Sequence, residues 1–306
     1  MQTKSAFVAI VGRPNVGKSS LLNALVGEKV AIVSNKPQTT RTRITGVLTK
    51  GEIQYVLLDT PGLHKPKNVL SEYMVKQVNE SVSEVNTAVL VTEATGEITN
   101  AERQLMETFS SLRIPAILAM NKIDLLEEKE KMLGKIAEFS QAFPFSAVVP
   151  ISVLKGDGID DLLNEISAFA KESPHFFPDD AMTDQPERVI AAEIIREKML
   201  FNLREEVPHG AAVVIEKMHD RAEDEPSENS PSNREIVDIE AIIYCEKESH
   251  KGIVIGKKGA MLKKIATEAR LEMESFFGIR VNLQCWVKVR EDWRNRQSQL
   301  RNFGFQ

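Results

Sequence analysis

Cysteine and aromatic residues are scarce in this chain of 306 residues, which has two cysteines and an aromatic share of 6%. Cys245 and Cys285 form no C-x-x-C pair, so zinc is not expected, and both are interpreted as reduced core thiols rather than as a disulfide. The sequence also lacks an apolar run of the roughly 20 residues that span a bilayer, and it lacks a signal peptide. We therefore expect a cytoplasmic protein whose membrane contact is at most peripheral.

A large excess of charge of one sign is missing as well, because the net charge is −5. Lys and Arg nevertheless outnumber Asp and Glu between Lys247 and Gln306. A basic region on an acidic chain predicts a localised site for a polyanion rather than a protein coated with positive charge. For the tail Arg290–Arg301, an ordinary solvated face is the alternative.

Residues Gly12–Ser19 read G-x-x-x-x-G-K-S, between the apolar runs Phe7–Val11 and Leu21–Val26. A strand, a glycine loop and a helix start are the context of a phosphate-binding loop. There, backbone N–H groups turn toward the phosphates, Lys18 reaches the β and γ oxygens, and the Ser19 hydroxyl ligates Mg²⁺. The alternative is a glycine-rich turn that caps an ordinary helix. The pattern predicts a nucleoside triphosphate site whose loop comprises Gly12, Arg13, Pro14, Asn15, Val16, Gly17, Lys18, Ser19 and Ser20.

The string Asn121-Lys122-Ile123-Asp124 follows the apolar run Ile114–Met120, so it lies at the carboxyl end of a predicted strand. Open α/β sheets bind ligands there. The Asp124 carboxylate can accept from both N1–H and the exocyclic amine of guanine, whereas adenine offers neither donor. Asn121 is predicted to brace the loops, and the Lys122 stem to lie over the base. The string alone is also common on surfaces, so the prediction of guanine depends on the phosphate loop that precedes it.

Two weaker strings complete the predicted nucleotide site. Asp59-Thr60-Pro61-Gly62 ends the apolar run Ile53–Leu58; Asp59 is placed to hold Mg²⁺ and the Gly62 N–H to meet the γ-phosphate, with an ordinary β-turn as the alternative. Ile151-Ser152-Val153 suits the last loop that contacts the base. The further predicted nucleotide contacts are Asp59, Thr60, Pro61, Gly62, Asn121, Lys122, Asp124, Ser152 and Val153.

The hydrophobic pattern divides the chain into two domains. Apolar strands alternate with helical patterns from Phe7 to about Ala170, which predicts a mostly parallel sheet with helices on both faces. Residues 171–187 break that pattern with three prolines and are predicted to be a linker. We therefore expect an α/β nucleotide-binding domain at 1–170 and a smaller α+β domain at 188–306.

The second domain is predicted to have the order α-β-β-α-α-β. Its expected elements are a helix at 187–206, strands at 212–218 and 236–245, helices at 249–255 and 260–277, and a strand at 281–289. An acidic segment, 220–233, is expected to be a loop between the first two strands. Trp286 lies on the polar face of the last strand, where it either stacks on a base or covers a neighbouring helix.

Gly256-Lys257-Lys258-Gly259 joins the two consecutive helices of this domain. Helix, G-x-x-G and helix form the centre of a KH domain, here in the bacterial-type order. Backbone N–H groups and lysines of such a loop clamp the sugar-phosphates, so that about four single-stranded nucleotides are read. A simple turn between helices is the alternative. Predicted RNA contacts are Ile255, Gly256, Lys257, Lys258, Gly259 and Lys263. Five apolar residues are predicted either to form the walls of the adjacent groove or to belong to the core: Ile253, Ile255, Ala260, Leu262 and Ile265.

Taken together, these strings resemble the Ras-like translation-factor GTPases and, within them, the Era family of ribosome-assembly GTPases. The resemblance is carried by GRPNVGKSS (12–20), KPQTTRTRITG (36–46), DTPGL (59–63), NKID (121–124) and the KH-type module, and it spans nearly the whole chain. It departs from the family pattern at Ser152-Val153, where Ser-Ala is usual; because contact there is expected through the backbone, little is put in doubt.

The resemblance implies ligands and partners that composition does not reveal. Thr39 or Thr40, preferably Thr40, would complete the Mg²⁺ ligands Ser19 and Asp59, and GTP and GDP would be the nucleotides. The implied partners are the 3′ end of 16S rRNA and the small (30S) ribosomal subunit. We also expect a monomer that can contact the inner membrane peripherally.

Two positions bear on how GTP would be hydrolysed. Leu63 occupies the position where many GTPases have the glutamine that orients water, and it cannot form that hydrogen bond. The resemblance to potassium-activated GTPases suggests that Asn15 helps to hold K⁺ beside the phosphates. The predicted catalytic residues are Lys18, Thr40, Gly62 and Asn15. The alternatives are a nucleotide-gated RNA-binding scaffold with incidental hydrolysis and, with little support, a phosphoryl-transferring kinase.

Overall fold

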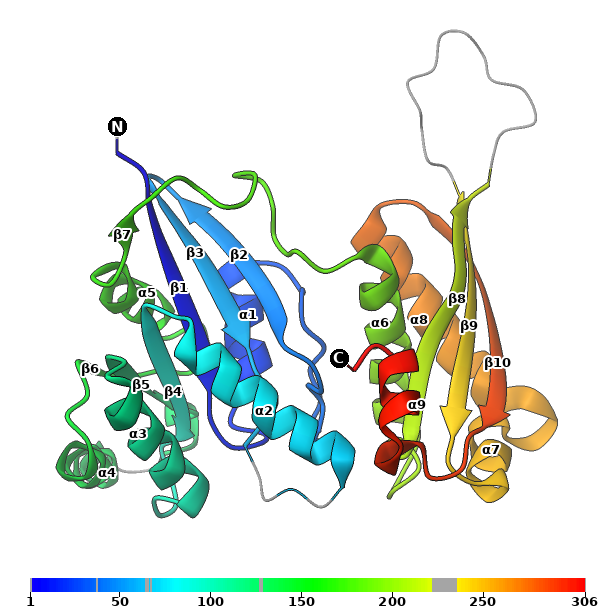
Figure 1. Ribbon diagram of the computed structural model, residues 1–306, viewed down its shortest axis with the longest axis horizontal. Coiled ribbons are helices and arrows are strands. Elements are labelled where there is room, and N and C mark those ends of the chain that lie inside the picture. The colour runs from blue at the N-terminus through cyan, green and yellow to red at the C-terminus, as the bar shows by residue number, and fades with distance from the viewer. Residues whose placement is uncertain are drawn as a thin grey trace, which may run out of the picture. The chain divides into compact units, whose positions relative to one another are not determined.

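The computed structural model describes residues 2–36, 38–63, 66, 68–126, 129–221 and 236–305, the side chains of 129–131 excepted. The chain divides into two compact units, Met1–Asp184 and Gln185–Gln306 (Figure 1). The acidic segment expected as a loop, 220–233, lies outside the described residues from 222 onward. Each unit has its own apolar core and is considered separately.

The first unit is built on one sheet with the strand order β2-β3-β1-β4-β5-β6, and β7 pairs with β1. Strands β3, β1, β4, β5 and β6 are parallel, whereas β2 is antiparallel to β3 and β7 is antiparallel to β1. The strands span Lys4–Val11 (β1), Ile44–Lys50 (β2), Ile53–Asp59 (β3), Thr87–Glu93 (β4), Ala116–Asn121 (β5), Ala147–Pro150 (β6) and Lys171–Glu172 (β7).

Helices cover both faces of this sheet, as the alternating pattern predicts. One core cluster packs α1 and α5 against the strands, and a second packs α2, α3 and α4 against the opposite face. The helices span Lys18–Val26 (α1), Val69–Ser83 (α2), Asn100–Leu112 (α3), Lys129–Ala142 (α4) and Ile159–Ser167 (α5). The motif-bearing loops follow β1, β3, β5 and β6, so parallel strand direction brings them to one edge of the sheet.

The segment predicted to be a linker, 171–187, lies mostly within the first unit. Gln54 Nε2 donates to the carbonyl oxygen of Phe177 at 2.9 Å, and the ring of Phe176 meets that of Phe7 at 5.0 Å. The prolines correctly mark the end of the helical pattern, but the two phenylalanines have apolar partners on the sheet. The two units divide after Asp184.

The second unit has the order α-β-β-α-α-β that the sequence predicts, followed by a short tail. Its sheet has the order β10-β9-β8, in which β10 is parallel and β8 antiparallel to β9. Helices α6 and α8 pack on one sheet face around a core that includes Ile239, Ile265 and Met273. The elements span Glu187–Asn202 (α6), Ala211–Asp220 (β8), Ile236–Cys245 (β9), Glu248–Ile255 (α7), Ala260–Phe277 (α8), Arg280–Val289 (β10) and Gln297–Asn302 (α9).

The tail after β10 folds back onto the sheet of its own unit. Trp293 is fully buried and its indole N–H donates to the carbonyl oxygen of Gly210 at 3.0 Å. Phe303 stacks on Tyr244 with ring centroids 4.7 Å apart. Phe305 stacks on Trp293 as well. These three aromatic residues are spread over thirteen residues without a helical or strand period, so the sequence predicted only a charged surface here.

Both cysteines are free, as expected. Cys285 lies beside Ala241 in the register of β10 and β9, and Cys245 lies beside Val289, so the two thiols do not face each other. Burial raises the pKa of Cys285 to about 12 and that of Cys245 to about 11. Both are therefore neutral core thiols.

Candidate nucleotide site and nucleic-acid interface

The loop between β1 and α1 has a backbone that only glycine can provide at two positions. Gly12 has φ +150°, and a Cβ there would lie 2.3 Å from the carbonyl oxygen of Val91. Gly17 has φ +101°, and a Cβ there would lie 2.4 Å from Asn121 Nδ2. The loop therefore packs tightly against β4 and β5.

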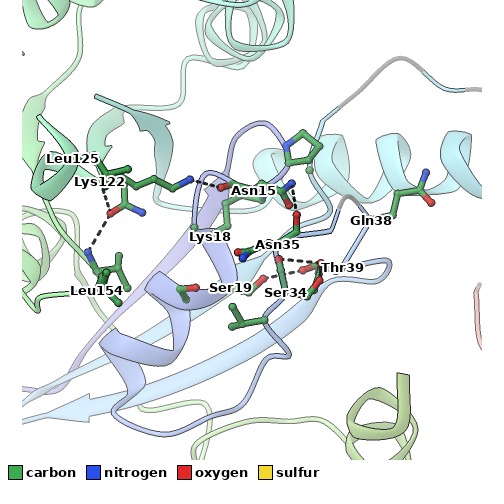
Figure 2. A pocket seen from close by; sticks show the side chains of 18 of the residues that line it. Asn15, Lys18, Ser19, Ser34, Asn35, Gln38, Thr39, Lys122, Leu125 and Leu154 are labelled. Carbon is green, nitrogen blue, oxygen red and sulfur yellow. Dashed lines mark hydrogen bonds between the residues drawn. The ribbon is translucent and has the colours of Figure 1, made fainter. Parts of the chain in front are cut away.

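A cleft of about 530 Å³ opens at this edge of the sheet, a volume in the range of small-molecule sites (Figure 2). Most of the predicted contacts line it, among them Pro14, Lys18, Gly62, Lys122 and Asp124. The sequence analysis missed six lining residues: Val33, Ser34, Asn35, Gln38, Leu125 and Leu154. Leu125 and Leu154 are exposed. Each is an apolar residue directly after a predicted motif, and that position was a signal in the sequence.

Lys18 is buried in the floor of this cleft (Figure 2). Its Nζ donates to the carbonyl oxygen of Arg13 at 3.0 Å. Burial lowers the pKa of Lys18 to about 8, and the Asp59 carboxylate opposes that shift. A buried ammonium group of this kind is poorly solvated, so a polyanionic ligand gains a strong partner there.

Three oxygen-bearing side chains converge beside Lys18. Ser19 Oγ donates to Asp59 Oδ2 at 2.6 Å, Thr40 Oγ1 lies 3.2 Å from the same oxygen, and the two hydroxyls are 2.9 Å apart. Asp59 Oδ1 is buried without a hydrogen-bond partner among the described residues. Burial raises the pKa of Asp59, against the opposing effect of the Lys18 ammonium. The cluster therefore has a spare buried acceptor and hard oxygen donors.

Thr39 and Thr40, in the segment between α1 and β2 that we call the first switch, differ in their surroundings. Thr39 Oγ1 donates to the carbonyl oxygen of Lys36 at 2.7 Å and lies 2.8 Å from Ser34 Oγ (Figure 2). Thr40 is buried beside Asp59 instead. This geometry favours Thr40 as the candidate metal ligand, in line with the preference from sequence.

Around the predicted base pocket, Asn121 braces three loops. Its Nδ2 donates to the carbonyl oxygen of Val16 at 2.8 Å, and its Oδ1 accepts from the backbone N–H groups of Lys122 at 2.8 Å and Val153 at 3.1 Å. The Ser152 hydroxyl donates to Asp124 Oδ1 at 2.5 Å. We expected Ser152 to act only through its backbone; its side chain in fact orients the carboxylate that would read guanine.

Two predicted contacts, Thr60 and Val16, point away from the cleft. Thr60 Oγ1 donates to the carbonyl oxygen of Ile10 at 2.9 Å, and Val16 is fully buried in the core. Leu63, which was not a predicted contact, is buried in the core and does not line the cleft. Gly62 lies against the phosphate loop, because a Cβ there would be 2.7 Å from Pro14 Cα.

Glu93, at the end of β4, is a site residue that the sequence analysis missed. Its Oε2 accepts from Arg13 Nη2 at 2.5 Å, and its Oε1 pairs with Lys122 Nζ. Lys122 Nζ also donates to the carbonyl oxygen of Asn15 at 3.0 Å. A single carboxylate therefore ties the phosphate loop to the loop that would bind the base.

Replacement of Glu93 by glutamine removes one of these two charge-assisted hydrogen bonds. We expect GDP to dissociate about five- to tenfold faster, because a partly exposed pair of this kind contributes about 1 kcal/mol. Stopped-flow displacement of a fluorescent GDP measures the rate. Glu97→Gln, an exposed change four residues along the same loop, is the matched control. Equal dissociation rates in the two variants would contradict the role of Glu93.

The G-x-x-G loop of the second unit also needs its glycines. Gly256 has φ +71°, and a Cβ there would lie 2.7 Å from Met261 Cβ. Gly259 and Lys258 also have positive φ, which gives a tight turn into α8. Lys257, Lys258 and Lys263 are exposed, so three ammonium groups are available around the turn.

The walls predicted for the adjacent groove are only partly available. Ile253 is exposed, and Ile255 and Leu262 are half-buried beside the loop. Ile265 is fully buried in the core and cannot line a groove. The 3.6-residue period places Ile265 and Leu262 near one another, but it does not reveal which of them faces the sheet.

The fold and site define the class of protein. A Ras-like α/β domain with a phosphate loop, an oxygen cluster and an Asn-Lys-x-Asp loop at one sheet edge is a GTP-binding domain, here joined to a KH-type domain. Family models agree: residues 7–122 match the 50S ribosome-binding GTPase model, and residues 206–294 match the KH domain model.

Relatives match along the whole chain. GTPase Era of Clostridioides difficile (strain 630) is 49% identical over 302 residues, 99% of this chain and 98% of that protein. GTPase Era of Ruminiclostridium cellulolyticum is 47% identical over 305 residues, with 100% and 98% covered. The chain belongs to the GTPase Era family, and it is a GTPase.

Two solved structures are similar at full length. One is Era in complex with MgGDPNP and nucleotides 1506–1542 of 16S ribosomal RNA, with a TM-score of 0.91, 40% identity and 99% of both chains covered. The other is an Aquifex aeolicus Era variant bound to GDP·AlF4−, with a TM-score of 0.90, 39% identity, and 100% of this chain and 99% of that chain covered. Among the described residues, no helix is long and apolar enough to cross a membrane.

Proposed function

We propose that this GTPase is a nucleotide-controlled switch that binds the 3′ end of 16S rRNA and acts in assembly of the small (30S) ribosomal subunit. The supporting observation is its full-length similarity to the Era that was solved with a GTP analogue and that RNA. The exposed lysines and glycine turn of the 256–259 loop give this chain a suitable RNA contact.

Mg²⁺ fits the cluster of Ser19, Thr40 and Asp59, since hydroxyl and carboxylate oxygens are the ligands that this hard cation prefers. The spare buried acceptor Asp59 Oδ1 supports the assignment. When bound, the ion supplies positive charge to the phosphate oxygens. Lys18 neutralises the same phosphates from the loop side, and the Gly62 N–H donates to the γ-phosphoryl oxygens.

The switch follows from which residues the γ-phosphate engages. Thr40 and Gly62 belong to segments that follow α1 and β3, and both line the cleft. We propose that GTP holds both segments at the cleft and that loss of the γ-phosphate releases them. Asn121 and Asp124 bind the guanine in both states, so the protein keeps its nucleotide while the switch segments change.

Asn15 is the proposed residue for potassium activation. Its φ is 65°, and its Nδ2 donates to the carbonyl oxygen of Asn35 at 3.0 Å, so the phosphate loop and the first switch meet there (Figure 2). A K⁺ held beside the phosphates would neutralise charge in the transition state where other GTPases use an arginine finger.

We therefore expect Asn15→Ala to lower the rate of GTP hydrolysis in K⁺ at least tenfold, toward the rate in Na⁺, because an arginine finger is worth roughly 10³–10⁵. Multiple-turnover phosphate release in the two salts measures this. Asn164→Ala, an exposed asparagine on α5, is the control. Equal wild-type rates in K⁺ and Na⁺ would contradict the potassium mechanism.

A second candidate function is an RNA-binding scaffold whose hydrolysis is incidental. The burial of Leu63 favours it, because the side chain at that position cannot orient a water. A scaffold hydrolyses GTP slowly in both salts, so the same rate measurement distinguishes the two functions.

RNA binding through the 256–259 loop is tested by the double change Lys257→Ala and Lys258→Ala. The affinity for an oligonucleotide from the 3′ end of 16S rRNA should fall, and the slope of log affinity against log salt should decrease by about 2, because two phosphate contacts are lost. Lys264→Ala is the control, since Lys264 already pairs with Glu268 at 3.8 Å. An unchanged affinity in the double variant would place the RNA elsewhere.

Location and assembly state are also proposals. We propose a cytoplasmic monomer that contacts the membrane at most peripherally, as the family resemblance implies.

A further inference from the structure

The sheet of the second unit has one face that α6 and α8 do not cover. Strand β10 turns Asn282, Gln284, Trp286 and Lys288 to this side, Arg290 follows directly after the strand, and all five residues are exposed. The alternate residues of β10 pack in the core with α6 and α8. We call the three residues Trp286, Lys288 and Arg290 the β10 platform.

Trp286 is the notable member, because 43% of its surface is exposed. Helices α6 and α8 pack on the opposite face of the sheet, so Trp286 covers neither of them. Its partner in the register is Ile242, which is buried. The exposed part of the indole is available for stacking.

The positive charge of the β10 platform is uncompensated. Among the described residues, neither Lys288 nor Arg290 has a carboxylate within ion-pair distance, whereas two carboxylates on this face, Asp238 and Glu240, are paired. Asp238 lies 2.6 Å from Arg221, and Glu240 lies 3.2 Å from Lys217. The charge of the platform is thus complementary to an anionic ligand rather than to a protein surface of mixed charge.

The C-terminal tail fixes the geometry beside the platform. Phe303 stacks on Tyr244, the β9 partner of Lys288, and the Arg290 guanidinium lies 5.9 Å from the same ring. Trp293 anchors the tail in the core. The tail covers the neighbouring aromatic and leaves Trp286 as the open ring on this part of the sheet.

An exposed indole flanked by cations fits single-stranded nucleic acid, because bases stack on the ring and phosphates meet the charges. The 256–259 loop reads only about four nucleotides. The RNA in the similar Era complex comprises nucleotides 1506–1542, which is more than such a loop reads. Helix α7, which ends at the loop, packs against β10, so the platform is near the loop within one unit (Figure 1).

We propose that the β10 platform is a second RNA-contact surface, on which Trp286 stacks with an unpaired base while Lys288 and Arg290 bind the adjoining phosphates. This inference rests on the proposed function, in which the chain binds rRNA through the 256–259 loop. It adds a contact outside the groove that a KH loop provides.

Tryptophan fluorescence tests the platform directly, because the chain has two tryptophans and Trp293 is fully buried. Two RNAs are compared: a five-nucleotide oligomer that fills only the loop, and RNA 1506–1542. The long RNA should quench the fluorescence of the wild-type protein and the short one should not. Trp286→Phe should remove the quenching and keep most of the affinity, since phenylalanine still stacks.

Trp286→Ala should lower the affinity for the long RNA about tenfold and leave the affinity for the short RNA unchanged. This loss is within the range for one stacked base. Lys288→Gln should produce the same selective loss, and as a surface change it keeps the test valid if Trp286→Ala does not fold. Phe201→Ala, which removes an exposed aromatic on α6, is the control.

Two outcomes overturn the inference. If the wild type binds both RNAs without quenching and the variants bind the long RNA equally well, the platform is not an RNA contact, while the loop assignment stands. If the wild type binds neither RNA, the proposed function fails together with the platform.

Discussion

Lys18→Ala abolishes guanine-nucleotide binding at micromolar concentrations of protein and ligand: this is the largest effect that the site predicts. Lys18 is buried in the floor of the cleft, and no other described lysine lines the cleft beside the phosphate loop except Lys122, which is engaged by Glu93. Loss of a buried charge that pairs with a ligand costs about 2–5 kcal/mol, or roughly 30- to 5,000-fold in affinity. Titration with a fluorescent GDP measures the change.

The same substitution should not lower the thermal stability of the nucleotide-free protein. Burial lowers the pKa of Lys18 from 10.5 to about 8, so the charged side chain opposes folding below pH 8, and this cost fades as the pH rises toward 10.5. Lys50→Ala, an exposed lysine on β2, is the control for charge alone. Wild-type affinity in Lys18→Ala would overturn the assignment of the phosphate loop.

Asp124→Asn changes which base the site accepts, and this is the second large effect. The carboxylate can accept from both guanine donors, whereas an asparagine amide offers one acceptor and one donor group. A mismatch at a polar site of this kind costs a factor of 10² or more, so we expect GTP affinity to fall by roughly that amount. Xanthine carries an oxygen at position 2 in place of the amine, and its nucleotide should bind better to the variant than to the wild type.

The gain for xanthosine triphosphate separates altered recognition from damage to the fold. Competition of GTP, ATP and xanthosine triphosphate against a fluorescent GDP gives the three affinities for each protein. Ser152→Ala is a second variant for comparison, because the Ser152 hydroxyl donates to Asp124 Oδ1. Its loss should lower the affinity for GTP mildly without raising the affinity for xanthosine triphosphate. Unchanged GTP affinity in Asp124→Asn would remove this residue from the base pocket.

The parts of the site that sequence predicts are those encoded locally. Gly12 and Gly17 are required by backbone conformation, and the Asn121–Asp124 string lies where a strand ends, so spacing and strand direction are enough to bring them together. The α-β-β-α-α-β order of the second unit is likewise carried by apolar periods within single elements.

What sequence does not predict depends on side chains that meet from distant segments. Glu93 joins Arg13, 80 residues earlier, to Lys122, and no local pattern distinguishes it from a solvated glutamate at a strand end. Ile265 and Trp286 show the same limit, because a period assigns residues to faces but does not say which face the neighbouring elements cover. The tail anchored by Trp293 depends on such long-range packing as well.

The central claim is that GTP controls RNA binding, and fluorescence anisotropy of a labelled oligonucleotide from the 3′ end of 16S rRNA tests it most directly. The oligonucleotide is titrated with the protein bound either to GDP or to a non-hydrolysable GTP analogue, at one fixed salt concentration. The account predicts tighter binding with the analogue. Equal affinity in the two states would leave a GTPase and an RNA-binding domain on one chain but would contradict the switch that connects them.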